Sequence, residues 1–178
     1  MKRVLIAIGV LGLLFLGIVG IYVFREISRP IDITEGIIGP YIFVLDNQPA
    51  GANDKTGEKG KEFTRALGEA GLGTGGGIVM VHSGIRQIPQ MGMIISEADI
   101  AKVKTLKMPT RVVKVSRRKG WKANISFDRG FVAALSVGRT APALIEKAKE
   151  AGYLSYYMVI RFDMKTKEQV IEVMQAGD

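Results

Sequence analysis

The chain has 178 residues, of which 47% are hydrophobic, and a formal net charge of +8 at pH 7. This length allows one ordinary domain and one short additional segment. Because the sequence contains no cysteine and a single histidine, it excludes a disulfide framework and a thiol nucleophile and argues against a transition-metal site, so we expect no metal and no cofactor.

The first predicted element is an apolar helix. Residues 4–24, VLIAIGVLGLLFLGIVGIYVF, contain no charge, and at about 1.5 Å per helical residue they would span the roughly 30 Å hydrocarbon layer of a bilayer. The competing interpretation, a secretory signal peptide, usually has an apolar core of about 7–15 residues and a small-residue cleavage site, and no such site follows here. The stretch predicts a single-pass membrane anchor between a tail at residues 1–3 and a linker at residues 25–35.

Basic residues on both sides of this stretch determine its orientation only weakly. Lys2 and Arg3 precede it, and Arg25 and Arg29 follow it. Because basic residues are retained on the cytoplasmic side and the amino terminus adds a charge, the count slightly favours a domain on the extracytoplasmic side.

The domain that follows, residues 36–178, begins with a β-α-β-β pattern. Short apolar runs rich in β-branched residues are typical of strands, and an apolar stripe at helical spacing around Phe63 predicts an amphipathic helix. A turn that contains Pro89 separates the last two strands. The predicted elements are a strand at 37–45, a helix at 59–70, a strand at 78–82 and a strand at 92–96.

A glycine-rich stretch, EAGLGTGGGIVMVHSG, joins this helix to the next strand. Gly71, Gly73 and Gly76 fit the spacing G-x-G-x-x-G of dinucleotide-binding loops. That spacing binds phosphate only where it follows a strand and opens a helix, because the free N–H groups of the helix hold the anion. Here the glycines end a helix and open a strand, so we expect Gly71 to be a left-handed helix C-cap and expect no nucleotide site.

The second half shows the same order of elements. Thr140 is the expected N-cap of its helix, and Pro142 lies within the first helical turn, where its missing N–H costs little. Two apolar runs near the end of the chain predict a hairpin. The predicted elements are extended segments at 112–115 and 122–127, a helix at 140–151, and hairpin strands at 154–162 and 169–174.

A constant offset of 81 residues relates the two halves, since EAGLGTGGGIVMV at 69–81 aligns with EAGYLSYYMVIRF at 150–162. We therefore predict an α+β fold made of duplicated β-α-β-β halves, at about 36–100 and 111–175. The halves would form one antiparallel sheet with two helices on one face, preceded by the N-terminal transmembrane helix.

Four segments carry a resemblance to a known family. They are GPY at 39–41, GIVMVHSGIRQIPQMGMIIS at 77–96, FDRGFVAAL at 127–135 and YLSYYMVIRF at 153–162. In order and spacing they resemble the GyrI-like family, a small-molecule-binding domain shared by effector domains of some transcription activators and by gyrase-inhibitory proteins. The resemblance covers about residues 36–175.

The resemblance implies a domain that binds amphipathic ligands. Many members of the family bind amphipathic cations with aromatic walls and a buried carboxylate on a second-half strand, and some relatives hydrolyse small substrates. In this chain the strand at 154–162 carries no acid before Asp163, and Arg161 occupies that region instead. The expected ligand is therefore a neutral or anionic amphiphile, or the pocket no longer binds one. Membrane-anchored members exist whose domain faces the cytosol, which leaves the orientation open.

Aromatic side chains on predicted strands are the candidates for a ligand wall, because they combine a large apolar area with a polar group. Tyr157 belongs to this aromatic set, and Met158 is a similar candidate because its side chain is soft and adaptable. Core packing is the alternative role for each of them. The predicted ligand-binding residues are Tyr41, Phe43, Trp121, Tyr156 and Met158.

Basic residues are concentrated between residues 102 and 122, where no acidic residue occurs. Such a run can meet anionic lipid headgroups, at about 1 kcal/mol per residue near the surface, or a nucleic-acid backbone, and a solvated connector is the alternative. No nucleic-acid-binding pattern accompanies it, so we expect no nucleic-acid partner. The predicted residues for an anionic surface are Lys114, Arg117, Arg118 and Lys119.

No catalytic constellation emerges from the sequence, so we predict that no residue is catalytic. Ser83 follows the single histidine, His82, but neighbouring residues on a strand point to opposite faces. The available carboxylates are not placed as an acid–base pair. These carboxylates are Glu35, Asp46, Glu97, Asp99 and Asp163.

Three functions follow as hypotheses. The first is a non-catalytic, membrane-anchored sensor or scaffold that binds a small amphipathic ligand or a protein partner. The second is an adaptor held against an anionic membrane by the basic segment, with a vestigial pocket. The third is a small-molecule hydrolase.

Overall fold

The computed structural model describes residues 2–28, 30–47, 58–72, 77–83, 90–126, 131–163 and 165–177. Its elements, in chain order, are α1 (Lys2–Ile27), β1 (Ile33–Ile38), β2 (Tyr41–Asp46), α2 (Glu58–Glu69), β3 (Ile78–Ser83), β4 (Gln90–Ile94), a 3₁₀ turn η1 (Glu97–Asp99), α3 (Ile100–Val103), β5 (Thr110–Val115), β6 (Arg118–Ser126), α4 (Phe131–Glu150), β7 (Ser155–Asp163) and β8 (Glu168–Gln175). The turn that contains Pro89 lies outside the described residues.

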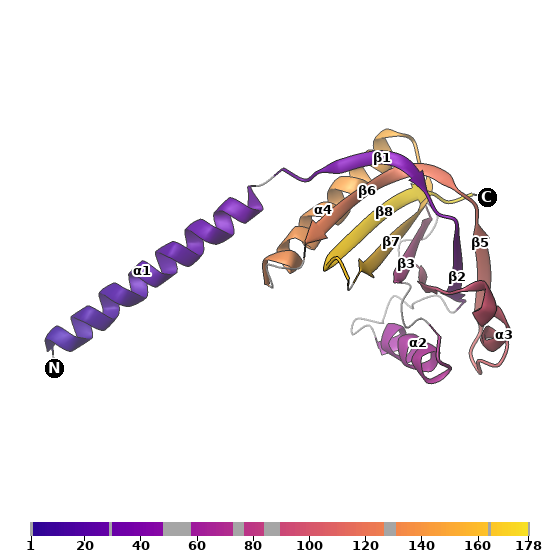
Figure 1. Cartoon of the computed structure of the whole chain (residues 1–178), viewed down its shortest axis with the longest axis horizontal. Coiled ribbons are helices and arrows are strands. Elements are labelled where there is room, and N and C mark those ends of the chain that lie inside the picture. Colours follow the sequence, from indigo (N-terminus) through magenta and orange to yellow (C-terminus); the bar gives the residue numbers. More distant parts are fainter. Residues whose placement is uncertain are drawn as a thin grey trace.

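The N-terminal helix α1 covers the stretch 4–24 and lies apart from the sheet (Figure 1). Within the part of the chain that the structure describes, no helix combines the length and the apolarity that crossing a bilayer requires. The predicted transmembrane anchor and the single-pass membrane location are therefore wrong. The predicted fold class is wrong as well, because it included an N-terminal transmembrane helix.

The eight strands form one antiparallel sheet, so the domain is an α+β fold. The order across the sheet is β1-β6-β8-β7-β3-β4-β2-β5. Read outward from the central β7–β3 pair, the strands follow the same order in both directions, β7-β8-β6 on one side and β3-β4-β2 on the other. The two edge strands are exchanged, because β1 precedes β2 in the chain but pairs with β6, whereas β5 precedes β6 but pairs with β2.

The predicted first strand at 37–45 is in fact two strands that join different parts of the sheet. Gly39 adopts a positive φ of 85°, and Pro40 has no amide hydrogen for a strand ladder. The chain therefore breaks at GPY, so that β1 and β2 separate at this point.

Both long helices of the domain pack on one face of the sheet. Phe63 and Leu67 of α2 pack against Val44, and Leu144 and Ala148 of α4 pack in a second cluster with Ile171. Cross-strand registers place Val44 and Ile171 on the same face. We call this the helix-covered face.

The two helices end in the same way, at the Glu-Ala-Gly of each half. Gly71 has φ 66° and Gly152 has φ 78°. In α2 the amide of Leu72 donates to the Leu67 carbonyl (2.8 Å), and in α4 the amide of Tyr153 donates to Ala148 (2.9 Å). This bonding pattern is the Schellman C-cap, so the prediction that Gly71 is a left-handed cap is confirmed. Gly73 and Gly76 lie outside the described residues.

The helix α4 begins at Phe131, earlier than the predicted 140–151. Thr140 is consequently not an N-cap. It lies in the helix interior, where its hydroxyl donates to the Ser136 carbonyl (2.7 Å). Pro142 also lies inside the helix. The helix thus runs through the expected cap, and the local capping preference of Thr140 does not set its start.

The opposite face of the sheet is concave, and no described helix packs on it (Figure 1). A cross-strand row on this concave face runs from Glu172 through Val159, Val79 and Gly92 to Leu45. A Cβ atom at Gly92 would lie 2.4 Å from Leu45 and 2.9 Å from Val79. Gly92 therefore leaves room for the Leu45 and Val79 side chains of the two neighbouring strands, and it allows the sheet to curl at β4.

Candidate functional site

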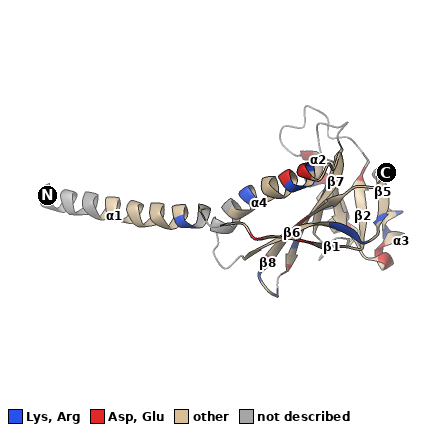
Figure 2. Cartoon of the chain, turned by 90° about the horizontal axis from the view of Figure 1, so that it is seen from above, with Lys and Arg blue, Asp and Glu red and all other residues tan. Residues whose placement is uncertain are grey.

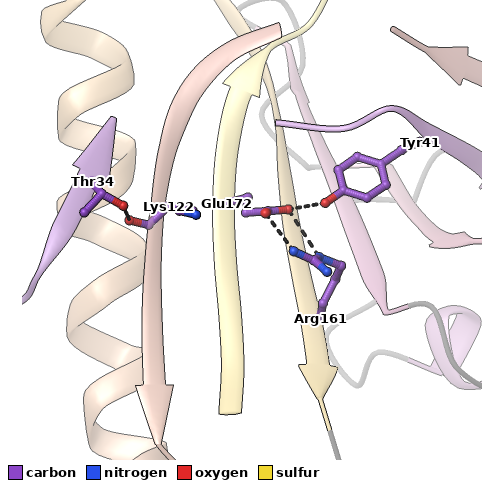
Figure 3. A network of polar contacts seen from close by, with 5 residues as sticks. All are labelled: Thr34, Tyr41, Lys122, Arg161 and Glu172. Atoms are coloured by element: carbon purple, nitrogen blue, oxygen red, sulfur yellow. Dashed lines mark hydrogen bonds and ion pairs between the residues drawn. The ribbon is translucent and has the colours of Figure 1, made fainter. Parts of the chain in front are cut away.

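A polar group crosses the concave face between strands that are not neighbours. Tyr41 lies on β2, Arg161 on β7 and Glu172 on β8. The Tyr41 hydroxyl donates to Glu172 Oε2. Arg161 Nη2 donates to Glu172 Oε1 at 2.8 Å, and Arg161 Nε lies 3.3 Å from Oε2. Figure 3 shows the Tyr41 and Arg161 side chains converging on the carboxylate; we call these three residues the polar triad.

The members of the polar triad differ in their exposure to solvent. The Glu172 side chain is 5% exposed, and the Arg161 side chain is 39% exposed. Burial is the largest cause that raises the pKa of Tyr41, and the adjacent Glu172 raises it further. Burial opposes the charge of Arg161, but its bonds to Glu172 raise its pKa above the ordinary value. The triad therefore holds a neutral tyrosine, a carboxylate and a permanent cation.

Aromatic rings continue from the polar triad along the concave face. The ring centroids of Tyr41 and Phe43 are 5.7 Å apart, and those of Phe43 and Tyr157 are 5.3 Å apart. The Arg161 guanidinium carbon lies 5.8 Å from the centre of the Tyr41 ring, within reach of a cation–π interaction. One side of the triad is thus aromatic and apolar.

An open groove of about 540 Å³ adjoins Tyr41. Most of its described lining is apolar, and the exposed ion pair between Lys114 and Glu97 lies at its side. A groove of this size is within the range that small-molecule sites occupy. The described lining residues are Pro40, Tyr41, Ile42, Ile94, Ile95, Glu97, Lys114, Val115 and Ser116.

The five predicted wall residues do not come together. Tyr41 and Phe43 share the concave face and stack on each other. Trp121, Tyr156 and Met158 lie on the helix-covered face, in the cluster beneath α4. Strand alternation explains the division, because Tyr157 and Arg161 point to the concave face while Tyr156 and Met158 point away from it.

Glu172 is the residue of this site that sequence reasoning missed. The family resemblance implies a buried acid on a second-half strand, and the strand at 154–162 has none before Asp163, whereas Glu172 lies on the following strand, β8. A usable signal exists in the sequence, since Glu172 is a lone charge within the apolar run VIEVM of a predicted strand. An acid in such a run is buried with a partner or is functional.

The predicted basic segment runs from α3 through the β5–β6 hairpin, and acidic side chains from other segments reach it. Figure 2 shows acidic positions beside basic ones around α3 and β5. Lys114 pairs with Glu97, Lys119 lies 3.0 Å from Glu35, and Arg118 donates to the Gln175 carbonyl (3.1 Å). Arg117 is exposed. These pairs reduce the free charge, and anionic-surface binding by the segment stays a prediction.

His82 lies on the helix-covered face, apart from the polar triad. Its ring stacks on Tyr156 with centroids 4.7 Å apart, and burial lowers its pKa. Its Nε2 atom is buried and has no hydrogen-bond partner among the described residues. The acids named from sequence serve local contacts. Asp99 bonds Ser96 and Lys102, and Asp163 accepts two backbone N–H groups of the β7–β8 turn. Within the described residues, no group of three or more metal-ligating side chains forms.

Comparison with protein-family models finds no match to this chain, and comparison with curated protein sequences finds none. The resemblance to the GyrI-like family accordingly stays a prediction.

Proposed function

We propose that this chain is a non-catalytic domain that binds a small amphipathic ligand beside the polar triad. The observation that carries the proposal is Glu172, a carboxylate that is 5% exposed on the face where no described helix packs. Arg161 and Tyr41 hold it, and an open groove adjoins it through Tyr41. The ligand would place its apolar body in this groove, against Tyr41 and Ile94, and its polar group near the triad.

Energetics favour a binding role for this arrangement over a stabilising one. Removing a carboxylate and a guanidinium from water costs several kcal/mol, and replacing a buried ion pair by apolar residues is often neutral or stabilising. Val79, Val159 and Leu45, which continue the row of Glu172 across the concave face, are apolar and fully buried. An apolar pair at this place would stabilise the fold about as well as the charged pair does. The charged pair, however, supplies the convergent polar groups that ligand pockets use.

The contacts of the triad favour binding over hydrolysis. The Glu172 oxygens already accept hydrogen bonds from Arg161 and Tyr41, so the carboxylate is not free to take a proton from water. Tyr41 holds its proton more tightly than an ordinary tyrosine. Histidine is the side chain whose ordinary pKa suits a general base near neutral pH, and the single histidine of this chain, His82, lies on the other face of the sheet.

A thermal-shift measurement on the purified full chain tests the proposal. The probes are three naphthalene compounds with one aromatic body and different polar groups, namely a carboxylate, an alcohol and a trimethylammonium. A ligand at about a hundred times its Kd stabilises by about 2.7 kcal/mol, and a change of 1 kcal/mol moves the melting temperature of a chain this size by about 2–4 °C. We expect a shift of several degrees with at least one probe.

A matched pair of variants locates the site. Tyr41→Phe removes the hydroxyl on the concave face, and Tyr156→Phe removes the same group on the helix-covered face. We expect the first to weaken probe binding and the second to leave it unchanged. Absence of a shift with all three probes, or equal losses in both variants, contradicts a ligand site on the concave face.

A further inference from the structure

The oxygens of Glu172 are occupied by the protein itself. Oε1 accepts from Arg161 Nη2, and Oε2 accepts from the Tyr41 hydroxyl and from Arg161 Nε. Because Glu172 is also almost completely buried, a ligand reaches this carboxylate only by displacing one of the two side chains. The guanidinium of Arg161 thus occupies the place that a ligand cation would take.

The exposed member of the ion pair is the positive one. The Arg161 side chain is 39% exposed, against 5% for Glu172. Glu172 uses two of the five N–H donors that a guanidinium carries, and the planar group is suited to bind a second carboxylate through others. Lys122, which is exposed, is the cross-strand neighbour of Glu172 and adds a second positive charge on the same face.

Acidic groups near Arg161 belong to the end of the hairpin. Asp163 and Glu168 form its last cross-strand pair, two residues beyond Arg161. Asp163 Oδ1 accepts the amides of Lys165 (2.8 Å) and Thr166 (3.2 Å), so its carboxylate is engaged by the turn. The accessible charge beside the aromatic rings is therefore that of Arg161.

We propose that Arg161 sets the ligand class of this site: it binds an anionic group, such as a carboxylate, of an aromatic or aliphatic amphiphile, and it excludes amphipathic cations by occupying Glu172. The inference rests on the proposed function, since it assigns a chemistry to the same site. It makes Arg161 a specificity-determining residue.

Isothermal titration of the full chain with the same three naphthalene compounds tests this assignment. The wild-type chain is expected to bind the carboxylate at least about tenfold more tightly than the trimethylammonium compound, a difference of about 1.4 kcal/mol. Arg161→Met removes the cation and frees Glu172, so it is expected to reverse the order of the two probes. Arg161→Lys keeps the positive charge and is expected to retain the preference for the carboxylate.

Two further variants separate specificity from loss of folding. The double variant Arg161→Met with Glu172→Gln removes both charges together, and it is expected to bind the alcohol while discriminating little between the charged probes. Lys147→Met removes a lysine from the exposed pair with Glu150 (2.8 Å) on α4 and is expected to bind as the wild type does. Circular dichroism confirms the fold of each variant before titration.

The outcomes distinguish the two proposals. Two outcomes refute the role of Arg161 and leave the ligand site standing. In the first, the wild type binds the trimethylammonium compound as tightly as the carboxylate. In the second, both Arg161→Met and the double variant keep the wild-type affinity for the carboxylate. If none of the three compounds binds the wild type, the ligand site itself is refuted, and the role of Arg161 with it.

Discussion

The hydroxyl of Tyr41 on β2 donates to Glu172 on β8, although β4, β3 and β7 lie between these two strands in the sheet. Residues so far apart in a flat sheet would not touch, because neighbouring strands are about 4.8 Å apart. The contact therefore depends on the curl of the sheet around Gly92, whose missing side chain leaves room for Leu45 and Val79. A glycine on β4, between the strands that carry Tyr41 and Arg161, thus helps to bring the polar triad together.

Removal of one charge from the triad should destabilise the chain more than removal of both. Glu172→Gln leaves the partly buried Arg161 without its anion, and we expect a loss of about 2 kcal/mol in the free energy of unfolding, below the usual range for a buried pair because Arg161 is 39% exposed. The double variant with Arg161→Met should regain most of that loss. Urea denaturation measures both values, and additive losses in the double variant contradict coupling between the two residues.

The matched control for this prediction is Glu97→Gln, which makes the same chemical change in the exposed ion pair with Lys114. Surface pairs contribute little to stability because water and salt screen them. We expect the urea midpoint of this variant to stay close to that of the wild type. A loss as large as that of Glu172→Gln means that burial does not determine the cost.

Alkaline pH should weaken the fold through Tyr41. Its pKa is raised by burial and by Glu172, so between the ordinary tyrosine value of about 10 and the raised value the folded state keeps a proton that the unfolded state has lost. The resulting stability is complete below about pH 10 and decreases as the pH rises above it, by at most about 1.4 kcal/mol per unit. Urea denaturation at pH 9 and pH 11 should show a smaller decrease for Tyr41→Phe than for the wild type, and equal decreases contradict the raised pKa.

Acidic pH should weaken the fold through His82. Burial lowers its pKa, so its contribution is complete above the ordinary value of about 6.5 and is lost as the pH falls through the lowered value. Because the chain has one histidine, its ring protons can be followed by NMR without ambiguity. We expect a midpoint below 6.5, and His82→Phe should remove this part of the pH dependence while keeping a ring against Tyr156. A midpoint at or above 6.5 excludes a desolvated imidazole.

Two glycine-to-alanine substitutions should differ strongly in cost. Gly77 has φ 114°, and a Cβ atom there would lie 2.3 Å from the Ile160 carbonyl oxygen and 3.0 Å from Arg161 Cα. Gly71 has φ 66°, and an added Cβ meets no atom within 4 Å. We expect Gly71→Ala to cost about 1 kcal/mol, as a left-handed backbone does, and Gly77→Ala to cost clearly more and to displace Arg161. Comparable urea midpoints for both variants contradict the close approach of β3 to β7.

Local patterns in the sequence were sufficient for the elements whose signals are local. The helix at 59–70, the strand after it and the C-terminal hairpin agree with α2, β3, β7 and β8 to within a few residues. Helices and strands that bury one face differ in the spacing of their apolar residues, so this spacing predicts the type of element. The Gly71 cap was likewise predictable, since a left-handed residue after a helix strongly favours glycine. The start of α4 could not be predicted from the capping signal at Thr140, because a local preference is a weak signal and the helix continues through it.

The tertiary structure alone decided which residues form the site. The exchange of β1 and β5, the division of the predicted aromatic residues between two faces, and the meeting of Tyr41 with Glu172 all depend on strand order and sheet curvature. These are long-range properties, and no local spacing in the sequence encodes them. Glu172 can be recognised in the sequence as an acid within a strand. Its partner Tyr41 can be identified only from the tertiary structure, because the curl of the sheet at Gly92 is what brings β2 toward β8.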